Sequence, residues 1–170
     1  MTVLDDDLMI FKFIRVLLFN MRHYLSSCKL SADFALQFPH SSKRSKMMRR
    51  MKQYAENIDN QAHLFNCSQL TMEEQWLFDQ DRIPDLPLNF PMTSLLNAIY
   101  QKYGQLAFPI LESACALNGE MLTFQQETDH LNQILDTVDQ LQSFNLWIVH
   151  YLHQRKASGQ FDELHQQDTH

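Results

Sequence analysis

The chain has 170 residues, of which 45% are hydrophobic and 20% are charged, and its net charge is −6 at pH 7. This length indicates one domain with a sizeable core, and the composition lies in the ordinary soluble range. Only three glycines and five prolines occur, which excludes a β-rich fold, because such a fold needs many glycine-bearing turns. We therefore expect an all-α protein.

The N-terminal segment favours a cytoplasmic location. It reads MTVLDDDL, which is acidic where a secretory signal peptide needs positive charge. The apolar run that follows is interrupted by Lys12 and Arg15 and is too short to span a bilayer. Three widely spaced cysteines, Cys28, Cys67 and Cys115, indicate reduced thiols rather than disulfides or a thiolate zinc site.

The first predicted helix covers about residues 5–28. At 100° per residue its polar side chains share one arc of about 160°, and nearly every other residue from Leu8 to Leu25 is apolar. The polar residues are Lys12, Arg15, Asn20, Arg22 and His23. An apolar face this wide is more than one neighbouring helix covers, so we expect a central position or a face shared with a partner. Ser31 as a cap and Pro39 as a stop predict a separate short helix over 31–38.

A second helix, over about 42–60, carries the most basic stretch of the chain. No acidic residue interrupts its cluster, which consists of Lys43, Arg44, Lys46, Arg49, Arg50 and Lys52. Its apolar side chains, among them Met48, Met51 and Ile58, share an arc of about 120°. Arg44 is the exception, because it projects toward the apolar side. The pattern predicts an amphipathic helix with one buried face.

The segment between the second and third long helices is irregular. Thr71 and Glu74 have capping-box spacing, which predicts a short helix over 71–81. Pro84, Pro87 and Pro91 then forbid a continuous helix and predict an extended, Pro-rich strap over 82–91.

Two further long helices follow, over about 93–117 and 123–156. The apolar phase of the first is kept across Pro109, which favours one helix over two. Thr123 and Gln126 predict a capping box at the start of the second. The fold is therefore predicted to be a four-helix-type bundle in one domain, 1–156, followed by a polar, disordered tail, 157–170.

The favoured function is a non-enzymatic, cytosolic protein-binding module, such as an adaptor, a secretion-chaperone-like protein or a regulator. The last helix is apolar almost all the way round at its end, so this end lies deep in the core or in an oligomer interface. The candidate partner-binding residues are Lys43, Lys46, Arg49, Arg50, Lys52, Phe144, Trp147, Ile148 and Tyr151. We expect another protein with an acidic or apolar surface as partner, and a homodimer is an alternative.

Two other classes remain as alternatives. Helix 42–60 has the charge for a nucleic-acid-associated regulator, although the whole chain is acidic and lacks helix-turn-helix spacing. Two pairs suggest a metal- or haem-binding bundle: the Glu-x-x-His pair Glu127 and His130, and the histidines His150 and His153. The sequence has no second copy of the Glu-x-x-His pair. Cys67 has no base next to it. We therefore assign no metal, cofactor or catalytic residue, and we expect no enzyme.

Overall fold

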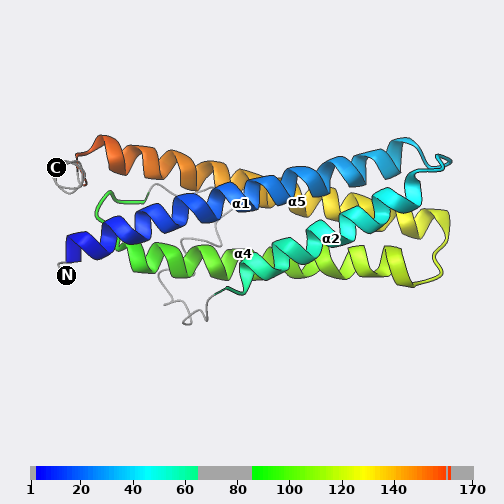
Figure 1. The fold of residues 1–170 in the computed structure, drawn as a ribbon, viewed down its shortest axis with the longest axis horizontal. Helices are drawn as coiled ribbons and strands as arrows, with labels where there is room; N and C mark the ends of the chain where they lie inside the picture. The colour runs from blue at the N-terminus through cyan, green and yellow to red at the C-terminus, as the bar shows by residue number, and fades with distance from the viewer. Residues whose placement is uncertain (1–2, 65–85, 160, 162–170) are drawn as a thin grey trace.

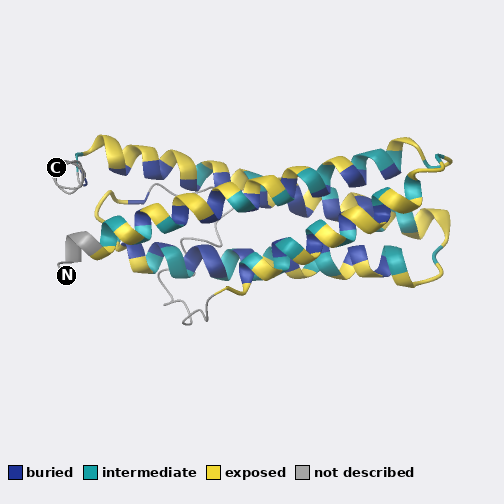
Figure 2. Ribbon diagram, viewed as in Figure 1, coloured by how far each residue is buried: buried dark blue, intermediate teal, exposed yellow. Residues whose placement is uncertain are grey.

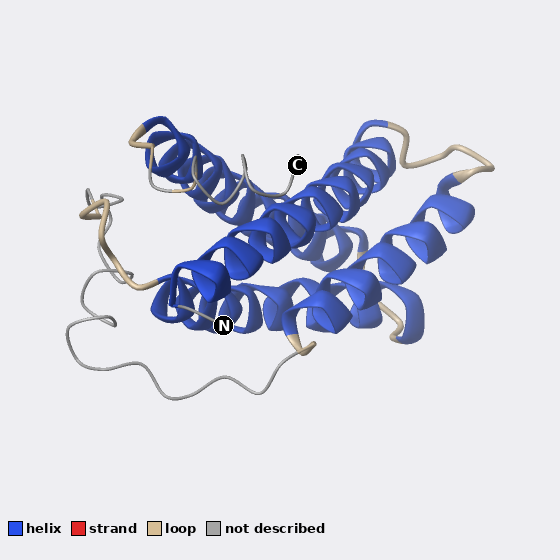
Figure 3. Cartoon of the chain, turned by 60° about the vertical axis from the view of Figure 1, so that its left-hand side comes forward, coloured by secondary structure: helices blue, strands red, loops and turns tan. Residues whose placement is uncertain are grey.

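The computed structural model describes residues 3–64, 86–159 and 161, and these form an all-α bundle without a strand in the described ranges (Figures 1 and 3). The helices are α1 (Val3–Gln37), α2 (Arg44–Ala62), α4 (Met92–Gly119) and α5 (Phe124–Ala157). The all-α prediction and the packing of four long helices are confirmed. Three predicted segments lie outside the described residues: the short helix over 71–81, residues 82–85 of the strap, and residues 162–170 of the tail.

Neighbouring helices run antiparallel around a ring. α1 packs against α2 and α5, and α4 packs against the same two helices, so the order around the bundle is α1, α2, α4, α5. The start of α1 and the end of α5 therefore lie at the same end of the bundle (Figure 1). Each helix carries alternating buried and exposed residues along its length (Figure 2).

The core of α1 follows a seven-residue repeat. Its buried residues are separated alternately by three and four positions, in the order Phe11, Ile14, Leu18, Met21, Leu25, Cys28, Ala32 and Ala35. These are positions a and d of a heptad abcdefg, with Phe11 at a. α5 repeats the pattern with Leu131, Ile134, Val138, Leu141, Asn145, Ile148, Leu152 and Arg155. Such a repeat keeps one face of each helix against its neighbour over the whole length.

α1 is one helix rather than the two that were predicted. The break expected near residue 30 does not occur, because the heptad stripe continues through the buried Ala32 and Ala35. Ser31 does not cap a new helix. Its hydroxyl donates to the carbonyl of Ser27, 3.1 Å away, which is an ordinary bond within a helix interior.

α4 is continuous across Pro109, as predicted, but departs from the heptad. Its buried residues Ile99, Tyr103 and Ala107 are separated by two consecutive steps of four. An extra four-residue step unwinds a coiled coil locally, and here it lies beside Gly104.

Caps and polar contacts fix the helix ends that meet at the far end of the bundle. The predicted capping box is present: the Thr123 hydroxyl accepts from the Gln126 amide, and the Gln126 side chain accepts from the Thr123 amide. Arg44 donates from Nη1 to the Glu127 carboxylate at 2.8 Å and from Nε to the Ala35 carbonyl at 3.2 Å. Arg44 therefore joins α2 to both α1 and α5.

The described part of the strap, 86–91, is held against α5 by two side chains. The Tyr151 hydroxyl donates to the Pro87 carbonyl at 2.7 Å, and the buried Arg155 donates to the Phe90 carbonyl. Phe161, within the segment predicted to be a polar tail, is buried with its ring centroid 4.7 Å from that of Phe11. Polar contacts at the core edge thus attach non-helical backbone to the bundle.

Replacing Tyr151 with phenylalanine tests this attachment. Tyr151→Phe leaves the Pro87 carbonyl without its donor, so we expect the free energy of unfolding to fall by about 1 kcal/mol in urea titrations. Tyr24→Phe, at a half-buried tyrosine of α1, is the control and should change it by less than about 0.5 kcal/mol. Equal effects of the two substitutions would contradict the assigned role.

Candidate partner-binding groove

The predicted apolar site at the end of α5 belongs to the core of this chain. Phe144, Ile148 and Tyr151 are buried, and Trp147 is half-buried. Phe144 lies edge-on to Tyr103, with ring centroids 6.2 Å apart, and Trp147 stacks on Tyr151. These four residues therefore present little surface in the folded chain, whereas Leu146 and Val149 of the same apolar end are exposed.

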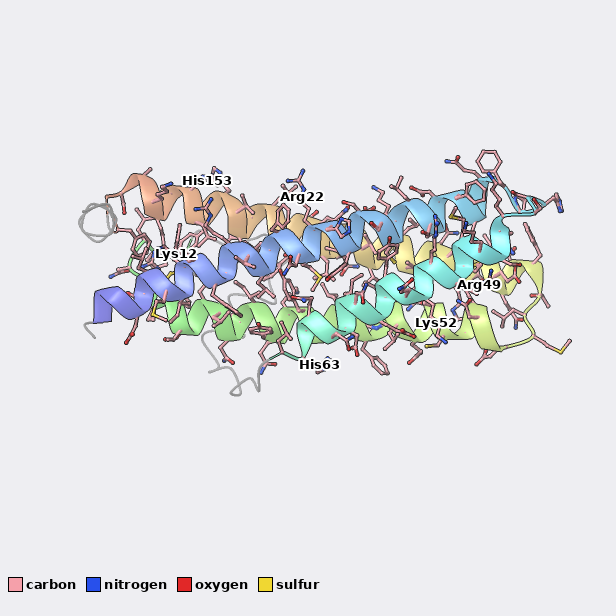
Figure 4. All side chains as sticks on the ribbon, viewed as in Figure 1. Lys12, Arg22, Arg49, Lys52, His63 and His153 are labelled. Atoms are coloured by element: carbon pink, nitrogen blue, oxygen red, sulfur yellow. The ribbon has the colours of Figure 1, made fainter. Side chains whose placement is uncertain are left out.

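The predicted basic residues lie on the outer face of α2. Lys43, Lys46, Arg49 and Arg50 are exposed and Lys52 is half-buried; Arg49 and Lys52 are labelled in Figure 4. Arg44 is the inward exception that the helical wheel predicted, and it pairs with Glu127. The structure therefore places the cluster on one exposed helix without bringing it beside the apolar site.

The residues considered for a metal site have other contacts. Glu127 is bound to Arg44, and His130 places Nδ1 3.3 Å from the Ser113 hydroxyl. His150 contacts the Gln154 side chain. Within residues 3–64, 86–159 and 161, no group of three or more His, Cys, Asp or Glu side chains is arranged to hold a metal ion.

An open groove of about 640 Å³ runs between α1 and α5 on the outside of the bundle. Its floor is apolar and includes Phe11, Leu18, Leu25 and Leu152, all buried core residues. The remaining lining residues are Arg15, Phe19, Arg22, Ser26, Gln142, Asn145, Leu146, Val149, His153 and Lys156. This size is in the range of ligand-binding clefts.

Large apolar side chains on the groove walls are exposed to solvent. Phe19 of α1 is 73% exposed, and Leu146 of α5 is 71% exposed. Val149, one turn further along α5, is 37% exposed. Since these three face a common groove, they form a patch rather than scattered surface residues. We refer to Phe19, Leu146 and Val149 as the groove anchors.

The two walls of the groove have regular spacing. On both helices the wall residues occupy heptad positions e and b, which lie beside position a on a helical wheel. They follow one another at steps of three and four: Arg15, Phe19, Arg22 and Ser26 on α1, and Gln142, Leu146, Val149, His153 and Lys156 on α5. Each helix thus carries a second stripe with coiled-coil spacing, next to its buried one.

The groove has positively charged edges. Arg15, Arg22, Lys156 and His153 line it, and no Asp or Glu does. The sequence has no acidic residue from Leu8 to Ala32 or over 140–161, although the chain as a whole is acidic. Figure 4 shows Arg22 and His153 projecting along the same edge, from α1 and α5. The local charge is therefore opposite to that of the protein.

A buried amide lies at the floor of the groove. Asn145 is only 6% exposed and occupies a core position of α5. Its Oδ1 accepts a hydrogen bond from the Tyr103 hydroxyl at 2.7 Å, while its Nδ2 has no acceptor among the described residues. Burial raises the pKa of Tyr103 well above its usual value, so this hydroxyl remains a donor. An unused donor at a core position is unusual and favours a polar partner nearby.

The groove anchors are not among the nine partner-binding residues predicted from the sequence, although Leu146 and Val149 belong to the apolar end of the last helix that was predicted to be core or interface. The excess apolar width of the first helix did predict a face shared with a partner, and Phe19 belongs to that excess. The signal that identifies the groove is the second stripe of three- and four-residue steps in 15–26 and in 142–156, both without acidic residues. Pairing these two stripes requires knowing that α1 and α5 are neighbours.

The described cysteines show no sign of a nucleophile. Cys28 is buried at a core position of α1, and burial raises the pKa of its thiol to about 12. Cys115 is exposed on α4. Cys67 lies outside the described residues.

Comparison with protein-family models, with curated proteins and with solved structures finds no match to this chain. Among the described helices, none is both long and apolar enough to cross a lipid bilayer.

Thiol labelling distinguishes Cys28 from Cys115. With Cys67 and Cys115 changed to serine, we expect Cys28 to resist maleimide at pH 8 until the chain unfolds, because the buried thiol stays protonated. With Cys67 changed to serine and Cys28 to alanine, Cys115 should react at the rate of a free thiol. Rapid labelling of Cys28 in the native state, followed by mass spectrometry, would contradict its burial.

Proposed function

We propose that this protein is a non-enzymatic protein-binding module and that the groove between α1 and α5 is its docking site. One observation carries the proposal: exposed apolar anchors from two helices share a groove in which the charged lining residues, Arg15, Arg22 and Lys156, are all cationic. Exposed apolar groups in a concave site lose water when a partner covers them, and the cations give the contact its selectivity. Adaptor, chaperone-like and regulatory roles all use a contact of this kind.

Charge argues against a second copy of this chain as the groove's occupant. In a two-fold dimer the same patch meets itself, so Arg15, Arg22 and Lys156 would face the cations of the other copy. Like charges placed together oppose association. A different protein with acidic character fits better than a homodimer.

The cellular location proposed is the cytoplasm. Cys28 and Cys115 are free thiols, and this supports a reducing compartment. The buried position of Cys28 suits a thiol used only as a small apolar side chain.

Site-specific photocrosslinking in the native host tests the docking site. A photoreactive residue at Leu146 or at Phe19 should crosslink the same protein, because both anchors face the groove. Leu30 of α1 is the matched control, since it is 70% exposed but does not line the groove, and it should give no such product. The crosslink from Leu146 should also weaken when Arg15 and Arg22 are changed to glutamate. Different proteins from the two anchors, or equal capture from Leu30, would contradict the proposal.

The exposed cations of α2 support a second candidate, contact with nucleic acid. Lys43, Lys46 and Arg50 are spaced by three and four residues on one exposed helix, a pattern suited to a row of phosphates. The acidic remainder of the chain opposes such a contact.

Salt-dependent retention on DNA and RNA tests this second candidate. For a phosphate contact through α2, we expect binding to weaken steeply with salt, and changing Arg49 and Arg50 to glutamate should lower the salt slope by about two. Arg15→Glu with Arg22→Glu is the control for net charge and should leave retention by α2 in place. Absence of binding at low salt would eliminate the nucleic-acid candidate.

A further inference from the structure

We infer that the occupant of the groove is an amphipathic α-helix of another protein, with acidic residues seven positions apart on either side of an apolar stripe. This inference rests on the proposed function and specifies the partner. It follows from the spacing of the walls, the positions of the cations and the distribution of the exposed apolar anchors.

The shape of the groove suits a helix. Its walls are the e and b stripes of α1 and α5, and each stripe proceeds in alternating steps of three and four. This is the spacing with which a helix receives the side chains of another helix. The floor and walls together extend over 11–26 on α1 and 142–156 on α5, about 22 Å at 1.5 Å per residue. A helix of about four turns spans that length.

The cations define where the partner carries negative charge. Arg15 and Arg22 occupy the same heptad position in successive repeats, so they are two turns apart, about 10.5 Å along α1. Two carboxylates seven residues apart on a parallel or antiparallel helix have the same separation. On the opposite wall, Lys156 faces the end of the groove that holds Arg15, because α5 runs antiparallel to α1.

The exposed anchors define the apolar stripe of the partner. Phe19 lies between Arg15 and Arg22 on one wall, and Leu146 and Val149 form the middle of the other. Apolar residues at steps of three and four, between the two rows of carboxylates, therefore reach the anchors and the floor.

A single-headed anionic amphiphile fits these features less well. Such a molecule carries one negative group, whereas the cations occur along the length of the groove, with Arg22 two turns from Arg15. Such a molecule also has no side chains that could pack between the wall residues, which follow one another at steps of three and four. The repeated cations and the repeated walls both match a repeating polymer with the rise of an α-helix.

Designed peptides test the inference with the full-length protein. The matched peptide has three heptads with leucine at positions a and d and glutamate at the flanking positions e and g, and fluorescence anisotropy reports its binding. A control peptide keeps this composition but moves the glutamates to positions c and f, which places the charges on the face opposite the leucines. We expect the matched peptide to bind at least about tenfold more tightly than the control.

Reversing the charges on both the protein and the peptide tests whether the cations contact the glutamates of the peptide. Changing Arg15 and Arg22 to glutamate should weaken the matched peptide about tenfold or more, and a peptide with lysine in place of glutamate should recover binding to this variant. Arg49→Glu with Arg50→Glu, on α2, is the matched control and should leave binding unchanged. Circular dichroism and the Tm of each variant confirm that it is folded.

Four outcomes would overturn the inference. Equal binding of the matched and the control peptide would remove the spacing argument, and failure of the lysine peptide to recover binding would remove the charge argument. Binding of dodecanoate without binding of either peptide would identify a single-headed amphiphile. Peptide binding that appears only after deletion of residues 162–170, which include Asp162 and Glu163, would identify the acidic tail of this chain as the natural occupant.

Failure of this inference is distinguishable from failure of the proposed function. If the protein crosslinked from both Leu146 and Phe19 contacts them through a basic or non-helical segment, the docking site stands and the acidic-helix inference falls. If the two anchors capture no common protein, the proposed function falls by its own test.

Discussion

The seven-residue repeat of buried side chains in α1 is the constraint on which the rest of this structure depends. It runs without interruption from Phe11 to Ala35, and α5 matches it from Leu131 to Arg155. Because a heptad keeps one face of a helix toward its neighbours, both helices turn one continuous stripe into the bundle and pack against each other. The extra four-residue step of α4 near Gly104 is accommodated on the other side of the bundle.

The groove follows from that repeat. When two antiparallel helices meet through their a and d positions, their e and b positions lie on the same flank, so whatever these positions carry is presented together. In α1 and α5 they carry cations and exposed apolar groups, such as Arg22, Phe19 and Leu146. The same register that builds the core therefore also builds the candidate binding site, and a change in one would alter the other.

Charge is organised differently on the two basic surfaces of the molecule. On α2 the cations point to solvent, except Arg44, which connects three helices through Glu127 and the Ala35 carbonyl. Along α1 and α5 the cations flank an apolar groove. A cation beside apolar surface that a partner covers acts in a less polar medium than one surrounded by water, so it discriminates more strongly between partners. The groove is for this reason the better basis for a specific contact.

The sequence by itself determined the fold class, the long helices, the continuity of α4 across Pro109 and the Thr123 cap, because these depend on local periodicity and on residues a few positions apart. It also predicted the inward direction of Arg44. Only the tertiary structure decided that α1 continues past Ser31 and which side chains at the apolar end of α5 are core and which are exposed, because both depend on what the other helices cover. The groove likewise required the pairing of α1 with α5. Two stripes more than a hundred residues apart form one site only when folding brings them side by side, and no local pattern contains that information.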